Sequence, residues 1–366
     1  EQMNGLGTTI ENMLNGTGGS GEETTPPEPT LPSDGSYSEE KGVNTPNLEE
    51  GMTAIKWDEA KNDWIETTGS DQEWYDYTAK KWANAKTSDG SMWVWIPRYA
   101  YSITSGYHSS STGNIEVEFM KGLTNETSTG RTSFQNASGQ GNWNIHPAFN
   151  YGQTVSGLWV AKFEASNSGG KIKVEPGVQS WRSITVNDIY TNCLNYNKTL
   201  NSHMMKNDEW GAVAYLSKSK YGKNAEVDIN SDSSYYTGGG SGNAYVNNVG
   251  QSTTGTVHGV YDMSGGAYEY VAAYVNNGNS SLSNGESLVN GDAKTKNVYS
   301  KGSSDDRDSN YSANSGKYGD AVYETSVNGN SSNSSWYGDD SYFPDTNSPF
   351  FLRGAFYGAG TSGGVF

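Results

Sequence analysis

The stretch Tyr261-Asp262-Met263-Ser264-Gly265-Gly266-Ala267-Tyr268-Glu269-Tyr270 decides the fold of this chain. It has two counterparts, Asn207-Asp208-Glu209-Trp210-Gly211-Ala212-Val213-Ala214-Tyr215 before it and Phe350-Phe351-Leu352-Arg353-Gly354-Ala355-Phe356-Tyr357-Gly358 after it. Each block places charged side chains among aromatic and small residues. Because a buried charge must find a partner, we predict that these carboxylates and Arg353 are buried, mutually satisfied groups that serve architecture rather than acid–base catalysis.

In this order, the three blocks resemble those of the formylglycine-generating-enzyme type of C-type lectin fold, and the resemblance covers about residues 91–366. It implies an α+β fold in which two helices lie around short twisted antiparallel sheets and long loops, preceded by a small Trp-rich β-hairpin module. The family's framework positions correspond here to Asp208, Glu209, Trp210, Tyr261, Asp262, Met263, Gly265, Glu269, Arg353, Gly354 and Tyr357.

The resemblance also bears on catalysis. Catalytic members of the family use two cysteines near the C-terminal end to hold copper, a task for soft thiolate ligands, and this chain has one cysteine, Cys193. A related iron-dependent branch needs clustered histidines, whereas His108, His146, His203 and His258 stand singly. We therefore expect hydrogen-bonded or solvent-facing histidines, a buried and unreactive Cys193, no catalytic residue and no enzyme.

The composition limits the class of partner. Lys and Arg total 24 against 41 Asp and Glu, for a net charge of -17, and nucleic-acid affinity depends on basic residues that contact phosphate. Nucleic acid and anionic membrane surfaces are therefore unfavourable partners. Aromatic residues make up 12% of a chain that is 33% hydrophobic, which predicts a core of rings between short strands. The low charge density is typical of an exported surface protein.

The N-terminal part is expected to consist of the end of a helix followed by a linker. Met3, Leu6, Ile10 and Met13 have the spacing of one helix stripe, so residues 1–15 are interpreted as the C-terminal remnant of an N-terminal helix of a prepilin-like protein. A chance pattern in a disordered start is the alternative. Contact with a membrane would come only through the missing part of that helix. Residues 16–43, rich in Pro, Gly, Ser and Glu, are predicted to be a linker.

Residues 44–90 are predicted to form a Trp-rich β-hairpin module packed on the following domain. Six of the eleven tryptophans lie between Trp57 and Trp95. Two units in this region, residues 57–64 and 75–82, each carry an aromatic residue at both ends of a polar turn, which is typical of a hairpin with a cross-strand aromatic pair. Exposed tryptophans that bind sugar rings are the alternative.

The remaining sequence, residues 91–366, is predicted to be one C-type lectin-fold ligand-binding domain. Strands are expected at residues 92–97, 157–164 and around 256–274. One helix should follow Thr185, with Val186, Ile189, Tyr190, Cys193 and Leu194 on its inner face. A second should begin at Asn207 as the cap, with Trp210, Val213, Ala214 and Leu216 facing the core. The polar stretches after Tyr221 and over residues 276–335 are expected to be long loops.

The C-terminal region combines framework residues with side chains typical of antibody binding loops, which are rich in Tyr, Ser, Gly and Asn. This pattern resembles the variable proteins of diversity-generating retroelements, with Ala355 departing from the usual second Gly of the Arg-Gly-Gly framework. We predict a loop face that binds an unknown protein or glycan. Its candidate residues are Tyr337, Asp339, Asp340, Ser341, Tyr342, Asp345, Asn347, Ser348, Leu352, Phe356, Ala359, Thr361 and Ser362.

Calcium is the one cofactor that the sequence leaves open, because it prefers oxygen ligands. Residues 228–232 carry alternating oxygen donors but lack the later Gly and Glu of a helix-loop-helix site. Residues 305–308 contain three aspartates interrupted by Arg307. Solvated loops are the favoured interpretation of both clusters, and no metal ligand is assigned.

Together these features predict a bacterial protein, extracellular or on the cell surface, that binds a ligand through its C-terminal loops. A phage tail receptor-binding protein, located on the virion, is the competing hypothesis for location. A structural pilin-like subunit and a metal-dependent oxidase on the same fold are the hypotheses from other classes.

Overall fold

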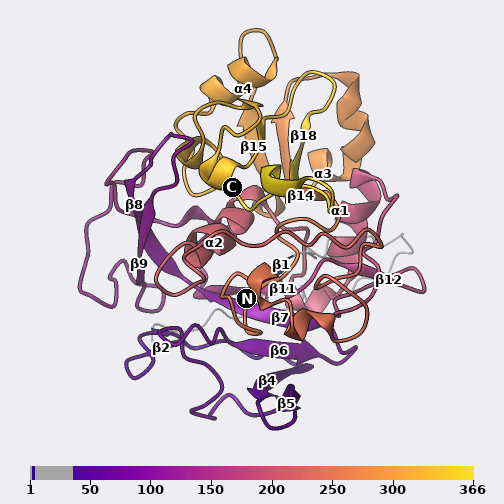
Figure 1. Ribbon diagram of the computed structural model, residues 1–366. Helices are drawn as coiled ribbons and strands as arrows, with labels where there is room; N and C mark the ends of the chain where they lie inside the picture. The colour runs from indigo at the N-terminus through magenta and orange to yellow at the C-terminus, as the bar shows by residue number, and fades with distance from the viewer. Residues whose placement is uncertain (1, 5–35) are drawn as a thin grey trace, which may run out of the picture.

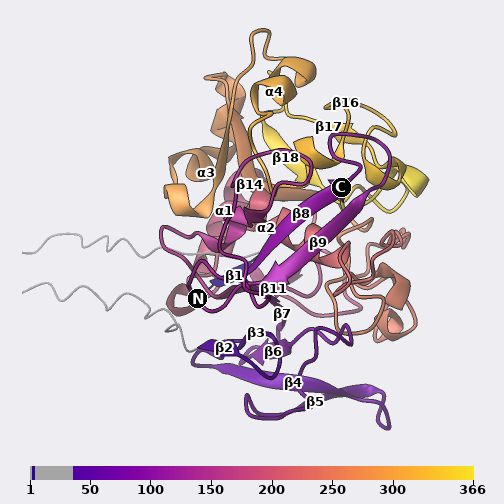
Figure 2. The ribbon, with the colours of Figure 1, turned by 90° about the vertical axis from the view of Figure 1, so that its left-hand side faces the viewer.

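The computed structural model describes residues 2–4 and 36–366. They form an α+β structure of small, mostly antiparallel sheets, and four α-helices lie in this part of the chain (Figures 1 and 2). The helices are α1 (Val186–Asn195), α2 (Asn207–Ser217), α3 (Glu286–Asn290) and α4 (Arg307–Ala313). None of these helices is long and apolar enough to cross a membrane.

The largest sheet has six strands in the order β1-β11-β7-β6-β4-β5. Its strands are β1 (Gln2–Asn4), β4 (Met52–Asp58), β5 (Asp63–Glu66), β6 (Asn84–Thr87), β7 (Met92–Pro97) and β11 (Gly157–Ala161). All six residues of β7 are buried, because the strand lies in the middle of the sheet with both faces covered. The strands predicted at residues 92–97 and 157–164 are confirmed, the second with an earlier end.

The first predicted aromatic hairpin is confirmed. β4 and β5 are antiparallel, and Trp57 pairs directly with Trp64, with ring centroids 5.5 Å apart. The second unit, residues 75–82, is not a strand hairpin, since one isolated bridge joins Asp76 and Lys81. Its rings turn inward instead, and Tyr77 stacks on Trp82 in the core.

The boundary predicted after residue 90 divides a continuous sheet. β6 and β7 lie on either side of it and pair directly, with Ala85 opposite Trp93. The Trp-rich segment is therefore part of the main sheet rather than a module packed against the next domain. Its tryptophans are buried, apart from the half-buried Trp57, so the interpretation of them as exposed sugar-binding rings is wrong.

The N-terminal predictions are corrected where the structure describes that segment. Residues 2–4 form β1, which pairs in parallel with β11, so the predicted helix over residues 1–15 is wrong there, and residues 5–15 lie outside the described part. Residues 16–35 of the predicted linker also lie outside it. The end of the linker is folded, because β2 (Tyr37–Ser38) pairs with β3 (Val43–Asn44), and Val43 is buried.

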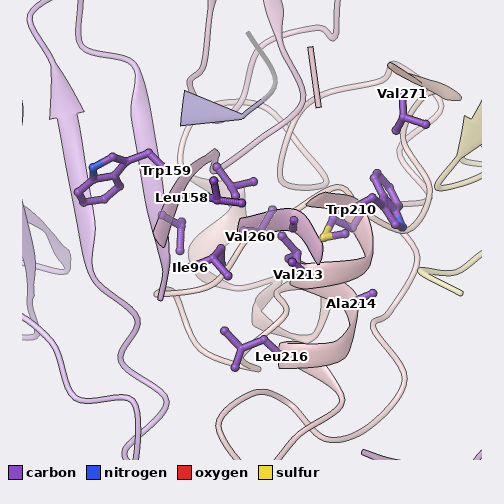
Figure 3. Close-up of a cluster of buried hydrophobic side chains, with 14 of the residues drawn as sticks. Ile96, Leu158, Trp159, Trp210, Val213, Ala214, Leu216, Val260 and Val271 are labelled. Carbon is purple, nitrogen blue, oxygen red and sulfur yellow. The ribbon is translucent and has the colours of Figure 1, made fainter. Parts of the chain in front are cut away.

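Helix α2 lies between the six-stranded sheet and the β14 sheet in both views (Figures 1 and 2). All eleven of its residues are buried, and Figure 3 shows Val213 and Leu216 among Ile96, Leu158 and Val260. The predicted inner stripe is thus buried, but so is the opposite side. Asn207 is not the cap: the helix begins after Lys206, whose backbone N–H donates to the Glu209 carboxylate at 2.8 Å.

Helix α1 is confirmed with its start. The Thr185 side chain accepts a hydrogen bond from the backbone N–H of Asp188 at 3.1 Å, which satisfies one of the free amide groups of the first turn. Val186, Tyr190 and Cys193 are buried, while Ile189 and Leu194 are half-buried against the core. The lone cysteine is therefore on the inner face, as predicted.

Two three-stranded sheets complete the core. One is β10 (Asn144–Ile145), β8 (Tyr99–Ser105) and β9 (Asn114–Phe119), and the other is β15 (Asn297–Ser300), β14 (Glu269–Asn276) and β18 (Phe350–Arg353). The strand predicted around residues 256–274 is β14, which begins only at Glu269. The stretch 276–335 is not one long loop, because it contains α3, β15 and α4.

Besides the β2–β3 pair, two further hairpins lie outside these sheets. β12 (Ser166–Ser168) pairs with β13 (Lys171–Lys173), and β16 (Asn330–Ser331) pairs with β17 (Ser341–Tyr342). Figure 2 shows β16 and β17 close to the C-terminus, and Figure 1 shows that β4 and β5 lie at the opposite end of the molecule from α4. The C-terminal loops thus gather at the end away from the tryptophan hairpin.

Candidate binding surface

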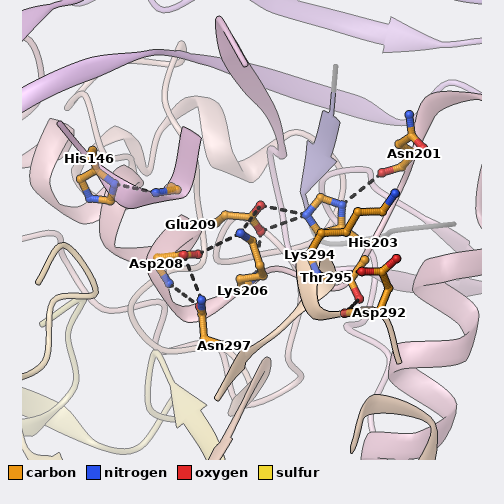
Figure 4. Close-up of polar contacts among 11 residues, drawn as sticks. His146, Asn201, His203, Lys206, Asp208, Glu209, Asp292, Lys294, Thr295 and Asn297 are labelled. Atoms are coloured by element: carbon orange, nitrogen blue, oxygen red, sulfur yellow. Dashed lines mark hydrogen bonds and ion pairs between the residues drawn. The ribbon is translucent and has the colours of Figure 1, made fainter. Parts of the chain in front are cut away.

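The first acidic block forms a buried polar network in front of α2 (Figure 4). His203 Nε2 lies 2.9 Å from Glu209 Oε1, and both side chains are fully buried. Lys206 Nζ lies 3.5 Å from Asp208 Oδ1, and the Asn297 side chain donates to Asp208 Oδ2 at 2.9 Å. These carboxylates are satisfied within the protein, as predicted for framework groups.

The other two blocks use backbone partners. Asp262 Oδ1 accepts hydrogen bonds from the Asn230 side chain at 2.9 Å and from the Gly238 N–H at 2.8 Å. Arg353 Nη2 donates to the carbonyls of Ala321 at 3.1 Å and Val365 at 3.3 Å. Asp262 and Arg353 therefore tie distant loops together rather than form an ion pair with each other. The prediction of mutually satisfied carboxylates is wrong for Glu269, which accepts no hydrogen bond from the described residues.

Four of the predicted ligand residues gather around Arg307. Its guanidinium lies 4.8 Å from the centroid of the Tyr342 ring, and its Nε donates to Asp345 Oδ2 at 3.2 Å. Asp345 Oδ1 also accepts from the backbone N–H groups of Asn347 and Ser348 at 3.1 and 3.0 Å. The Tyr342 side chain is 49% exposed, so this group presents a ring that its neighbours hold in place.

A second group lies beside the chain end. The Asp340 N–H donates to the Ser362 carbonyl at 3.1 Å, next to the short 3-10 helix Gly360–Ser362. Thr361 is exposed, whereas Tyr337, Ala359 and Ser362 are half-buried. The predicted residues of this group are at the surface but contribute mostly backbone and small side chains.

Asp339 is not a surface residue, which corrects its place among the candidates. Its side chain is buried, and Oδ2 accepts a hydrogen bond from the Phe366 N–H at 3.1 Å. Burial raises the pKa of its carboxyl to about 8. Asp339 therefore anchors the end of the chain. Its contact with Phe366 joins segments 27 positions apart, so the residues next to Asp339 in the sequence could not predict it.

A run of half-buried and exposed aromatic rings accompanies the candidate Phe356. The Phe356 ring lies 5.5 Å from Tyr268 and 5.4 Å from Tyr357, Tyr357 meets Tyr235 edge-on at 4.9 Å, and the Arg182 guanidinium covers Tyr235 at 3.8 Å. We call these five residues the aromatic run. Tyr268 is 56% exposed.

Sequence reasoning missed three members of the aromatic run, Tyr268, Tyr235 and Arg182. The sequence did contain a signal for Tyr268. It is a large aromatic residue inside the block 261–270, but it is not one of the family's framework positions, so it was free to serve as a binding residue. Leu352, another candidate, is exposed on β18 opposite Tyr270 of β14.

A polar hollow of about 740 Å³ lies beside the β16–β17 hairpin. Asn328, Asn330 and Asp308 line it together with stacked rings, of which His108 lies 4.0 Å from Tyr323. Asn330 pairs with Tyr342 across the hairpin. The hollow therefore adjoins the group around Arg307 and extends it with amide and hydroxyl side chains.

The two acidic clusters weighed for calcium are engaged by their own loops. Asp228 Oδ1 lies 2.7 Å from Lys223 Nζ, and Asp232 accepts from the Ser234 N–H at 2.7 Å. Asp306 caps α4 by accepting from the Ser309 N–H. Within residues 2–4 and 36–366, no group of three His, Cys, Asp or Glu side chains is arranged to hold a metal ion.

The buried titratable groups predict how stability depends on pH. Burial raises the pKa of Glu324 to about 7, where hydroxyls of Tyr101 and Tyr215 donate to it at 2.7 and 2.9 Å. Burial also raises the pKa of Asp339, and lowers the pKa of both His146 and His258 to about 3. The two histidines are therefore neutral in the folded state at neutral pH.

We expect the free energy of unfolding to fall as the pH rises from 6.5 to 8.5. The folded state holds protons on Asp339, Glu269 and Glu324 that the unfolded chain has already lost, and it releases them over this range, so stability is lost by roughly 4 kcal/mol. Urea unfolding at a series of pH values measures the change. Asp339→Asn should make the profile shallower, because Glu269 and Glu324 still release protons over this range, and a stability that rises with pH would contradict the expectation.

In comparisons with known proteins, no family model matches this chain and no curated protein matches it.

Proposed function

We propose that this protein is a non-enzymatic ligand-binding protein displayed on a bacterial surface. On this proposal its fold is the C-type lectin fold of the formylglycine-generating-enzyme type, in the form used by diversity-generating-retroelement variable proteins. Its C-terminal loops bind a protein or a glycan. The competing location is a phage virion, where the same loops would recognise a host receptor.

The observation that carries the proposal is the set of large exposed rings on a rigid support. Tyr268 and Tyr342 are about half exposed, and each is positioned by a neighbour, Phe356 for Tyr268 and Arg307 for Tyr342. Rings held in this way supply contact area at a low cost in conformational entropy. Large apolar side chains exposed together on a surface are typical of an interaction site.

The polar hollow supports a glycan as one ligand class. Its wall combines the stacked rings of His108 and Tyr323 with amide and hydroxyl side chains, which can stack on a sugar and bind its hydroxyl groups. The exposed rings support a protein ligand equally well. A binding experiment with both classes decides between them.

The assignment as a non-enzyme rests on Cys193. The thiolate, not the thiol, is the nucleophile and metal ligand, and burial raises the pKa of the Cys193 thiol well above its usual value. A protonated thiol inside the core suits packing rather than oxidation chemistry. The chain supplies no second cysteine to pair with it.

Removing the exposed rings should abolish binding and leave the fold intact. We expect the triple variant Tyr342→Ala, Asn347→Ala, Phe356→Ala to lose at least about tenfold in affinity for its ligand. The melting temperature should move by less than about 2 °C, because exposed side chains contribute little to stability. Capture on printed glycans and on immobilised extracellular proteins measures binding.

The matched control changes Glu59 and Lys61 to alanine, on the hairpin at the other end of the molecule (Figure 1). It should bind like the unmodified protein. A triple variant that loses stability and binding together would show that these side chains are core, and unchanged binding would remove this face from consideration.

A further inference from the structure

An apolar cavity of about 140 Å³ lies between α1 and α2, and among its lining residues it shares only Tyr268 with the aromatic run. Cys193 and Ile189 of α1, Met204, Trp210 of α2 and Val271 of β14 form much of its wall. Tyr268 also lines it and is largely exposed, so the cavity reaches the surface at that residue.

Two carboxyl groups, Glu164 and Glu269, interrupt this apolar wall. Glu164 is satisfied, since Oε1 accepts from the Ala267 N–H at 2.9 Å and Oε2 accepts from the Ser180 hydroxyl. Glu269 differs, because no residue in the described part of the chain donates a hydrogen bond to its carboxyl. Glu269 is half-buried, and it lines the cavity, so a ligand inside could donate to its carboxyl.

The surroundings of Glu269 are acidic, and no Lys, Arg or His of the described residues forms an ion pair with it. Burial and the nearby negative charge of Asp262 raise the pKa of Glu269 to about 8, and burial with the charges of Glu269 and Asp262 raises the pKa of Glu164. Arg353 lies opposite Glu269 in the β14–β18 register, but its guanidinium donates to the carbonyls of Ala321 and Val365. From α1, Cys193 faces the cavity as a neutral thiol.

We propose that this cavity binds a primary alkylammonium group, either as a small free amine or as the end of a lysine side chain. The ammonium would donate to Glu269, and the alkyl stem would lie against Ile189, Met204 and Trp210. A cavity of similar volume in another protein holds one benzene molecule, so a stem of about four carbons fits. The net charge of -17 raises the local concentration of cations.

The protonation of Glu269 gives this site a pH signature. At pH 6.5 the Glu269 carboxyl holds a proton. This proton must leave when the ammonium binds, because the carboxyl O–H and the ammonium N–H are both hydrogen-bond donors. Affinity should therefore rise by up to about tenfold per pH unit as the pH approaches 8, and then level off while the amine stays charged. A purely apolar ligand would show no such dependence.

Calorimetric titration tests the proposal with n-butylammonium chloride, n-butanol and Nα-acetyl-lysine amide at pH 6.5, 7.5 and 8.5. We expect saturable binding of n-butylammonium that strengthens with pH and exceeds that of n-butanol by at least about tenfold. Comparable binding of the lysine derivative would identify a lysine side chain as the source. Binding of n-butylammonium alone would identify a free amine.

Three variants separate the site from general effects. Glu269→Gln, which keeps the shape and removes the charge, should weaken n-butylammonium at pH 8.5 by at least about tenfold and erase the pH dependence. Glu59→Gln removes the same charge from an exposed position and should bind normally. Cys193→Leu fills the cavity and should abolish binding, which keeps a test available if Glu269→Gln does not fold.

The proposal is overturned by an absence of saturable n-butylammonium binding at millimolar concentration, by n-butanol binding as tightly as the amine, or by undiminished binding in Glu269→Gln. The loop-face test changes Tyr342, Asn347 and Phe356, none of which lines the cavity, and it uses different ligands. The two ideas can therefore fail separately.

Discussion

Glu209→Ala is expected to lower the free energy of unfolding by about 4 kcal/mol, because it leaves several buried donors without an acceptor. Glu209 Oε1 lies 2.9 Å from His203 Nε2 and 3.8 Å from Lys206 Nζ. Its Oε2 accepts from the Lys206 N–H, a hydrogen bond that caps the N-terminus of α2. Removing the carboxylate would take away the acceptor of the buried His203 Nε2, would leave the Lys206 ammonium with Asp208 as its remaining carboxylate neighbour, and would uncap the helix at the centre of the fold.

Urea unfolding at pH 7, followed by tryptophan fluorescence, measures this loss. Glu209→Gln keeps an oxygen acceptor for the Lys206 N–H and should cost less, about 2 kcal/mol. Thr185→Ala removes the cap of the more exposed helix α1 and should cost about 1 kcal/mol. A Glu209→Ala loss no greater than that of Thr185→Ala would show that the network in Figure 4 contributes little to stability.

The elements that the sequence predicted well are those whose signal is local. The Trp57–Trp64 hairpin pairs residues seven positions apart, and the cap of α1 lies within one turn of its partner Asp188. Helix α4 shows the same principle in a case that was missed. Asp306 was considered for calcium, whereas it is the N-cap of that helix, and the acceptor spacing to Ser309 was visible in the sequence.

The features that the sequence could not reveal depend on contacts between distant segments. From the sequence, Asp339 is expected to be an exposed loop aspartate. In the structure it is buried and accepts a hydrogen bond from the Phe366 N–H at the end of the chain. Tyr235 joins the aromatic run only because the fold brings its loop to Tyr357. Likewise, the six-stranded sheet continues through the predicted boundary at residue 90, since hydrophobic pattern alone does not say which strands share a sheet.

Burial on all sides of α2 is the most consequential of these features, and it leads to a second large effect. We expect Gly211→Ala to destabilise the protein by about 3 kcal/mol, although alanine favours a helix over glycine by about 1 kcal/mol. A Cβ at this position would lie 2.0 Å from the Gly319 carbonyl oxygen and 2.8 Å from Asp320 Cα. Both contacts are with backbone atoms, which cannot rotate away as a side chain would.

Neither α2 nor the loop at Gly319 and Asp320 can move aside to make room for the added Cβ. The helix is held by the Tyr99 hydroxyl, which donates to the Ala212 carbonyl at 2.7 Å. The opposing loop is held by the Gly319 N–H, which donates to Glu324 at 2.8 Å, and by the Tyr299 hydroxyl, which donates to Asp320 at 2.7 Å. A shift on either side would break buried hydrogen bonds, so strain should remain and appear as lost stability.

The matched control is Gly316→Ala, because a Cβ there would meet nothing within 4 Å and the residue is exposed. Its unfolding free energy should stay within about 0.5 kcal/mol of the unmodified protein. The comparison isolates close backbone approach from the general effect of replacing glycine. If Gly211→Ala proved as stable as the control, α2 would have room to move, and the contact between the helix and the 319–320 loop would not be the fixed element that positions the C-terminal loops.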